Sequence, residues 1–201
     1  MKGKAFSFFA VFFTALLFFP SPSACKEINR CLKYRSLVVR EARYRLGLNA
    51  PSHYFLGQIE QESRCNSAIK AFDGGMGLGQ FMPETAEWIQ KREKDLQSIS
   101  ARPVPYDPRW SIRALIIYDN WLFKNAACNT WHYAFRAYNG GLGNLNREIR
   151  AAGSCDRRAV EKACRRKTLK LKQGCLDLCR VNIAYPQRIL ARAAKYERAM
   201  K

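Results

Sequence analysis

The 201-residue sequence predicts an all-α fold, a single helical domain that contains disulfides, and three observations support this prediction. Apolar residues recur at helical spacing through most of the chain, and strand signals are nearly absent. Hydrophobic residues make up 48% and aromatic residues 12% of the chain, which is enough apolar material for one packed core. Eight cysteines behind a leader of the export type favour disulfides.

The first 24 residues have the pattern of a secretory signal peptide. Two lysines precede the apolar run at 5–19, and small, turn-forming residues follow it. Fifteen residues form a helix of about 22 Å, short of the roughly 30 Å of a bilayer core. We expect cleavage after Ser23 or Ala24, with an uncleaved anchor as the alternative. Pro22 stands where a lipoprotein signal has an aliphatic residue, which argues against lipidation of Cys25.

The remaining residues, 25–201, are expected to form the helical domain. Gly47 ends the first helix, Ser52 can cap the second, and Pro83 suits the first turn of the third. Asp107 caps the fourth helix, which carries a broad apolar face. The expected helices cover 32–46, 52–63, 83–89, 108–122, 130–139 and 186–200.

A basic stretch at about 151–180 differs from the rest of the chain. It is rich in Lys and Arg and holds four of the eight cysteines. We expect an insertion stapled to the main body, although eight cysteines allow 105 pairings and the sequence selects none. With two histidines and no CxxC spacing, we expect no metal site.

One helix carries the most informative acid. Phe55, Ile59 and Glu62 share a face at 100° per residue, whereas Glu60 lies about 160° away and is expected to be solvated. A carboxyl in an apolar setting keeps its proton near neutral pH, as a general acid must. The alternative is a structural Glu62 that pairs with an arginine such as Arg64.

Residues 73–83 read DGGMGLGQFMP and lead into the third expected helix. Four glycines within six residues let the backbone come close to a ligand. The run does not satisfy GxGxxG and follows no strand, so a nucleotide-binding fingerprint is excluded. Asp73 is expected to cap a turn in this loop.

Three ordered motifs resemble those of the soluble lytic transglycosylase (SLT) family. They are QES at 61–63, GGMGLGQFMP at 74–83 and AYNGG at 137–141, and Tyr185 resembles the tyrosine of a fourth motif. The match covers roughly residues 50–200. The resemblance implies a lysozyme-like helical domain that cleaves peptidoglycan.

The resemblance also implies a role for each matched residue. Glu62 matches the family's single catalytic acid and base, and Ser63 matches a serine that helps to orient the site. Tyr138 and Asn139 match residues that contact the N-acetyl group of the sugar. The implied substrate-binding residues are Ser63, Gln80, Tyr138, Asn139 and Tyr185.

Two positions and one segment depart from the family pattern. Gly79 replaces the usual Met, and Gly141 replaces a common Ala, so both changes are expected to widen the cleft. The cysteine-rich stretch between Asn139 and Tyr185 has no counterpart in the motifs, and we expect it to remodel the floor of the groove.

The implied reaction is that of a lytic transglycosylase, which cleaves the bond between N-acetylmuramic acid and N-acetylglucosamine and leaves a 1,6-anhydro product. Only Glu62 acts in this reaction, without a metal or cofactor, unlike the two-carboxylate glycosidases. One alternative is a hydrolase resembling goose-type lysozyme, with Asp73 activating water. The other is a catalytically silent, cationic wall-binding protein.

Charge favours an anionic partner. The chain carries 35 Lys+Arg and 16 Asp+Glu, and removing the leader with its two lysines leaves 33 − 16 = +17. We expect peptidoglycan strands and an anionic wall or membrane surface as partners, in the periplasm or outside the cell. Export and the lack of a nucleic-acid motif argue against nucleic acid. A secretion or conjugation machine that opens the wall is a further candidate partner.

Overall fold

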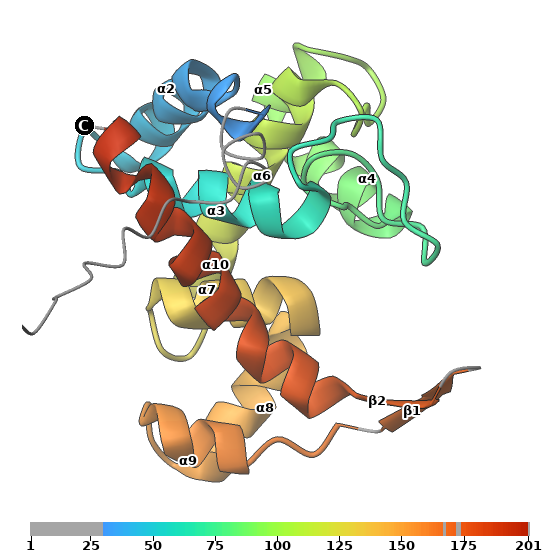
Figure 1. Cartoon of the computed structure of the whole chain (residues 1–201), viewed down its shortest axis with the longest axis vertical. Coiled ribbons are helices and arrows are strands. Elements are labelled where there is room, and N and C mark those ends of the chain that lie inside the picture. The colour runs from blue at the N-terminus through green and yellow to red at the C-terminus, as the bar shows by residue number, and fades with distance from the viewer. Residues whose placement is uncertain (1–29, 167, 172–173, 201) are drawn as a thin grey trace, which may run out of the picture.

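The computed structural model describes residues 30–166, 168–171 and 174–200. The expected signal peptide at 1–24 and Cys25 lie outside the described residues. The fold is mostly helical, as predicted (Figure 1). Within the described ranges, no helix combines the length and apolarity needed to span a bilayer.

The helices follow one another through short connections, with one hairpin before the last. The elements are α2 (Arg35–Leu46), α3 (Ser52–Ser63), α4 (Pro83–Arg92), α5 (Lys94–Gln97), α6 (Pro108–Asn125), α7 (Trp131–Gly140), α8 (Leu142–Ala152), α9 (Arg157–Lys162), β1 (Thr168–Leu171), β2 (Gly174–Asp177) and α10 (Leu178–Met200).

Side-chain caps start two of these helices where the sequence places them. The carboxylate of Asp107 accepts hydrogen bonds from the backbone N–H groups of Arg109 and Trp110 at the start of α6. The hydroxyl of Thr130 accepts from the N–H of Tyr133 in α7. These bonds satisfy donors that the first turn of a helix leaves unpaired.

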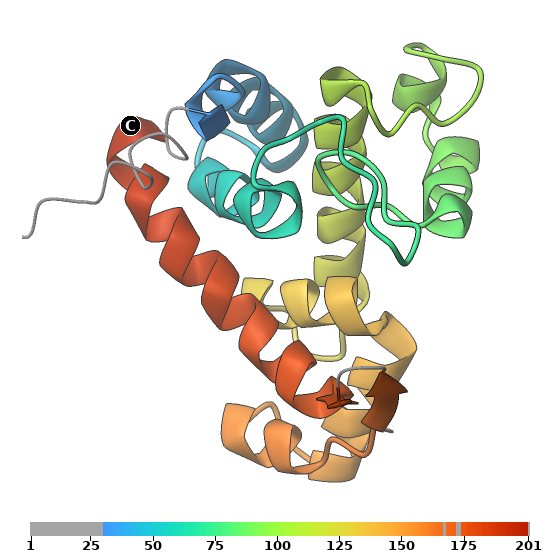
Figure 2. The ribbon, with the colours of Figure 1, turned by 45° about the vertical axis from the view of Figure 1, so that its right-hand side comes forward.

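Helix α3 lies at the centre of the fold, packed against α2 and α10, and α10 crosses it diagonally (Figure 2). The crossing is close because position 57 is glycine: a Cβ there would lie 2.7 Å from the backbone N of Ala193. Most residues of α3 are therefore buried, including Phe55 and Ile59, which are fully buried. Close packing of α3 limits the motion of the side chains in its last turn.

The C-terminal half departs from the sequence prediction in three ways. Helix α10 begins at Leu178 and not at residue 186, and Pro186 lies buried inside it. Packing of α10 against α3 and α7 offsets the backbone hydrogen bond that a proline removes. The expectation that strands are absent is wrong for β1 and β2, which pair antiparallel. Helices α8 and α9 were not predicted.

Three disulfides link the described residues. Cys31–Cys65 ties the N-terminal helical region to the end of α3. Cys128–Cys155 attaches the start of the basic stretch to the main body, and Cys164–Cys179 joins two points within that stretch. Cys175 lies exposed on the hairpin.

Candidate active site

Glu62 occupies the last turn of α3, where its side chain is half-buried. Burial raises the pKa of its carboxyl to about 7, and the negative charge of Asp73 adds to this rise. The Tyr185 hydroxyl, from α10, donates a hydrogen bond to Glu62 Oε1, which opposes the rise. Near neutral pH, the protonated and ionised forms of Glu62 are therefore both populated.

Among the described residues, Glu62 does not pair with an arginine, which was the alternative that the sequence analysis left open. Arg64 is exposed, in a left-handed conformation just beyond α3, and no ion pair with Glu62 occurs among the described residues. Burial raises the pKa of Tyr185 far above its ordinary value, so this side chain keeps its proton. It serves Glu62 as a neutral donor, not as a counter-charge.

The prediction that Glu60 is solvated is wrong. Its side chain is only 2% exposed, because α10 covers that face of α3. Lys195 Nζ lies 2.6 Å from one carboxylate oxygen, and the Tyr196 hydroxyl donates to the other at 2.5 Å. Glu60 thus holds α3 and α10 together and is excluded from the cleft.

A second buried acid, Asp119 on α6, was missed by the sequence analysis. It is fully buried, and Gln58, one turn before Glu62, donates from Nε2 to its Oδ1 at 3.4 Å. Burial raises the pKa of Asp119 well above its ordinary value, and the charge of Glu62 adds to this. Asp119 Oδ2 and Gln58 Oε1 are buried without partners among the described residues, and a proton on Asp119 supplies a donor for them. No motif contains Asp119, so spacing gave no signal for it.

The glycine loop, residues 66–82, is folded tightly upon itself. Met76 exchanges backbone hydrogen bonds with Phe81, and Gly77 N donates to Ile69 O. A Cβ on Gly77 would lie 1.8 Å from the carbonyl oxygen of Pro105, so only glycine allows this approach. Gln80 Nε2 donates a hydrogen bond to Gly77 O at 2.8 Å, so the Gln80 side chain stabilises the conformation of the loop.

Asp73 caps a turn in this loop, as predicted. Its Oδ1 accepts from the backbone N–H of Gly75 at 3.3 Å, and its side chain is exposed. Asp73 is nevertheless close enough for its charge to raise the pKa of Glu62. It is the exposed acid on the opposite wall of the cleft.

Tyr138 and two glycines shape the wall between the loop and α7. The Tyr138 hydroxyl donates to Gly79 O at 2.6 Å, which ties α7 to the glycine loop. A Cβ on Gly79 would lie 2.6 Å from the ring of Phe81, so the ring already fills the space that the sequence analysis expected to be open. Gly141 has φ +84°, and this backbone conformation accounts for the glycine there.

Asn139 is exposed at the end of α7, and its carbonyl accepts from Asn182 Nδ2 at 3.3 Å. Behind it lies a buried ionic network that the sequence analysis missed. Arg136, fully buried, donates to Glu148 at 2.7 Å and to Asn182 at 3.1 Å. Arg166 donates to the other oxygen of Glu148 at 3.0 Å. Asn182 is the member of this network that bonds Asn139, and Arg136 holds Asn182 in turn.

Ser63 does not reach the cleft. Its side chain is buried, and its hydroxyl donates back to Ile59 O at 3.0 Å within α3. Among the described residues, no three His, Cys, Asp or Glu side chains gather as a metal site would require.

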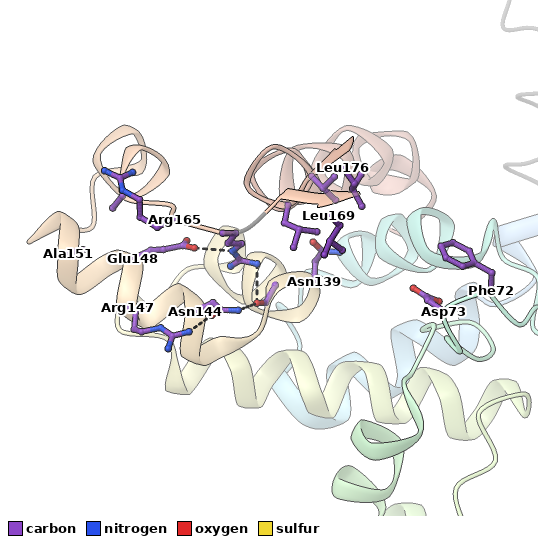
Figure 3. Close-up of a pocket in the computed structure, with 15 residues that line it drawn as sticks. Phe72, Asp73, Asn139, Asn144, Arg147, Glu148, Ala151, Arg165, Leu169 and Leu176 are labelled. Atoms are coloured by element: carbon purple, nitrogen blue, oxygen red, sulfur yellow. Dashed lines mark hydrogen bonds and ion pairs between the residues drawn. The ribbon is translucent and has the colours of Figure 1, made fainter. Parts of the chain in front are cut away.

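A groove of about 950 Å³ has Asp73 and Asn139 among its lining residues (Figure 3). Phe72 and Asp73 of the glycine loop line one side of it, and Asn139 and Gly140 at the end of α7 also line it. Residues of α8, of the segment 163–166, of β1 and β2 and of the start of α10 complete it. We call it the hairpin groove.

Comparison with known proteins gives one family. The family model described as the transglycosylase SLT domain matches residues 40–160. The chain belongs to the SLT transglycosylase family. No curated protein sequence matches the chain.

Comparison with solved structures shows that the chain also has the SLT fold. The 70-kDa soluble lytic transglycosylase of Escherichia coli superimposes with a TM-score of 0.65 at 25% identity, covering 84% of this chain and 25% of that protein. A complex of the 70-kDa soluble lytic transglycosylase with bulgecin A gives 0.61 at 25% identity, over 87% and 25%. The predicted family and its mostly helical, lysozyme-like fold are confirmed, and the chain spans about a quarter of the length of those structures.

Proposed function

We propose that this SLT-family chain is a peptidoglycan lytic transglycosylase in which Glu62 is the single general acid and base. The observation that supports this most directly is the half-buried Glu62 carboxyl with a pKa of about 7. A group poised at this value gives and takes a proton with equal ease near neutral pH. A reaction with one carboxylate requires this, because the same group must first donate a proton and then accept one.

In the first step, protonated Glu62 donates to the oxygen that links N-acetylmuramic acid to N-acetylglucosamine, and the bond from that oxygen to C1 breaks. The substrate's own acetamido group supports the cationic centre at C1, in place of a second carboxylate. In the second step, ionised Glu62 takes the proton of the muramyl 6-hydroxyl, whose oxygen bonds to C1. The ring closes as a 1,6-anhydro sugar, no water is consumed, and Glu62 regains its proton.

The surrounding residues position the participants. Tyr185 holds the Glu62 carboxyl and stabilises its ionised form between the steps. Asn139, braced by the buried ionic network, presents an amide to the N-acetyl group. Tyr138 and Gln80 act through the glycine loop, since both donate hydrogen bonds to its backbone. Ser63, bonded within α3, supports the last turn of that helix.

Hydrolysis resembling that of goose-type lysozyme is the second candidate, and one observation favours it. Asp73 is exposed in the cleft and acts electrostatically on Glu62, so its carboxylate is available to activate water. Its engagement with Gly75 N favours the structural role instead. Asp73→Asn separates the two, because only the hydrolase depends on this carboxylate for activity.

We place the protein in the periplasm or outside the cell, as the signal peptide pattern indicates. Three disulfides among the described residues agree with an oxidising compartment. The partners we propose are glycan strands and an anionic wall or membrane surface, which the net charge attracts. Opening the wall for a secretion or conjugation machine would use the same cut.

The decisive experiment digests purified peptidoglycan with the mature chain and with Glu62→Gln, and weighs the products by mass spectrometry. We expect muropeptides one water lighter than hydrolysis products from the wild type and none from Glu62→Gln. Products of full mass would establish the hydrolase and direct attention to Asp73. A folded wild type that binds peptidoglycan without releasing products would establish the silent binder.

A further inference from the structure

The last turn of α2 and the turn that follows it expose two large apolar side chains to solvent. Tyr44 is 74% exposed and Leu48 is 83% exposed, and among the large apolar side chains of the described residues only Phe72 is more exposed. Leu48 follows Tyr44 by four residues, just beyond Gly47, whose φ of +87° ends the helix. Exposed apolar residues that are scattered singly need no explanation, whereas two neighbours of this size indicate a contact surface.

Two exposed arginines lie on the same side of α2. Arg40 and Arg43 precede Tyr44 by four residues and by one, which places the three side chains within about 100° around the helix. Arg43 forms no ion pair with a described acid, and Arg40 approaches Glu41 at 3.4 Å. Each guanidinium has five N–H donors, so both keep donors for a partner. We call Arg40, Arg43, Tyr44 and Leu48 the α2 patch.

The acids beside the α2 patch do not neutralise it. Glu41 is buried and accepts two hydrogen bonds from Arg113, at 2.8 and 3.0 Å. Glu93 and Asp95 both pair with Arg45. Residues 33–48 hold five basic side chains and one acid, so this side of the molecule stays positive even when Glu93 and Asp95 are counted. An anionic partner is therefore attracted to it.

The combination of charge and apolar surface selects the kind of partner. The hollow beside Tyr44 has a volume of about 220 Å³, which is less than the roughly 300 Å³ of the smallest typical ligand pockets, so a small ligand is a poor match. A soluble polyanion would meet the arginines but has no apolar phase to receive Tyr44 and Leu48. A bilayer of anionic phospholipids offers both, with phosphates at its surface and acyl chains just below them.

The α2 patch lies far from the proposed catalytic acid. Leu48 precedes the start of α3, whereas Glu62 occupies its last turn, and the helix rises about 15 Å from Ser52 to Glu62. Helix α2 also lies at one end of the long axis of the molecule, with the hairpin at the other (Figures 1 and 2). A bilayer that met the α2 patch would therefore leave Glu62 accessible to strands of the wall.

We propose that the α2 patch docks the protein on the surface of an anionic phospholipid bilayer. Arg40 and Arg43 contact lipid phosphates. Tyr44 lies at the level of the headgroups, and Leu48 enters the outer part of the acyl region. Charge and apolar insertion act together, because either signal alone gives weak and reversible attachment. The inference rests on the proposed function for the compartment, but it does not involve Glu62.

The test mixes the mature chain with vesicles of phosphatidylcholine and with vesicles that also contain phosphatidylglycerol, and measures binding by co-sedimentation. We expect binding to the anionic vesicles and little binding to the neutral ones. Arg40→Gln and Arg43→Gln should each weaken binding about fivefold, and Leu48→Ala about tenfold. Because Leu48→Ala leaves the charge unchanged, its effect separates insertion from long-range attraction.

Matched controls are Arg158→Gln on α9 and Leu169→Ala on the hairpin, which change the same kinds of side chain at exposed positions outside the α2 patch. Both should bind like the wild type, and circular dichroism confirms the fold of each variant. Equal binding by the patch variants and the controls would overturn the inference, as would a wild type that does not bind the anionic vesicles. So would patch variants with unchanged vesicle binding and weaker binding to purified peptidoglycan, which would assign the α2 patch to the wall.

The outcome is separable from that of the proposed function. With isolated peptidoglycan as the substrate, the patch variants should release products at the wild-type rate, because the α2 patch is not part of the site. If the wild type releases none, the transglycosylase proposal fails, while selective binding to anionic vesicles still supports docking. If digestion is normal and Leu48→Ala binds these vesicles like the wild type, membrane docking fails and the transglycosylase stands.

Discussion

Removing the hydroxyl of Tyr185 tests the electrostatics of the proposed site. In Tyr185→Phe, Glu62 stays buried but loses the donor that stabilises its ionised form. A hydrogen bond to a charged group contributes about 1.5–3 kcal/mol, and one pKa unit corresponds to about 1.4 kcal/mol. The pKa of Glu62, about 7 in the wild type, should therefore rise by roughly one to two units.

The assay is the pH dependence of kcat/KM for release of soluble products from peptidoglycan. Protonated Glu62 starts the reaction, so activity falls as pH rises through its pKa, and the alkaline limb reports that value for the unliganded enzyme. We expect this limb to move to higher pH by about one unit or more in Tyr185→Phe. A ¹³C NMR titration of the glutamate carboxyls, assigned with Glu62→Gln, measures the same shift directly.

Tyr196→Phe is the matched control. It removes the same hydroxyl from the same helix, but this hydroxyl donates to Glu60 and not to Glu62. Its alkaline limb should coincide with that of the wild type. If Tyr185→Phe folds and its limb stays in place or moves to lower pH, Tyr185 does not stabilise ionised Glu62 and the argument is wrong.

Three further variants test the supports of the site. Burial raises the pKa of Asp119 well above its ordinary 3.8, so the wild type should lose stability as pH rises above about 4, and Asp119→Asn should make the melting temperature less dependent on pH there. Gly77→Ala places a Cβ 1.8 Å from Pro105 O at φ +68°, and chemical denaturation should show a loss of about 2 kcal/mol or more. Replacing Cys164 and Cys179 by serine opens a loop of 15 residues, which should cost about 3 kcal/mol and speed proteolysis of the hairpin.

Local signals in the sequence predicted the helices as far as α7, apart from the short α5. Asp107 and Thr130 start their helices because a side-chain oxygen can satisfy the donors of the first turn, whatever the rest of the chain does. The glycine run was expected to let the backbone approach a ligand, whereas at Gly77 the structure shows a close approach to Pro105 of the same chain. Helical geometry alone placed Glu62 on the same face as Phe55 and Ile59, and its resemblance to the family motif then indicated its role.

Contacts between distant segments account for what the sequence did not predict. Pro186 is a strong stop signal, yet α10 starts eight residues earlier because its packing against α3 and α7 outweighs one lost hydrogen bond. The hairpin is short, and alternation over four residues is too weak a signal to separate it from a basic helix. Asp119 looked like any acid on an amphipathic helix, since only the fold shows that α3 covers it.

Glu60 and Glu62 show why a face on a helical wheel does not decide the chemistry of an acid. The rule that placed Glu62 towards the core placed Glu60 towards water, but α10 lies across α3 and supplies a tyrosine to each of them. Tyr185 and Tyr196 are three turns apart on α10, within roughly 20° of one another. Glu60 also receives Lys195, whereas no cation lies within ion-pair distance of Glu62 among the described residues. Arg192, also on α10, lies 3.8 Å from the same carboxylate oxygen of Glu60. The difference between a structural carboxylate and a candidate acid therefore comes from two cations on the covering helix, and their positions relative to α3 exist only in the folded chain.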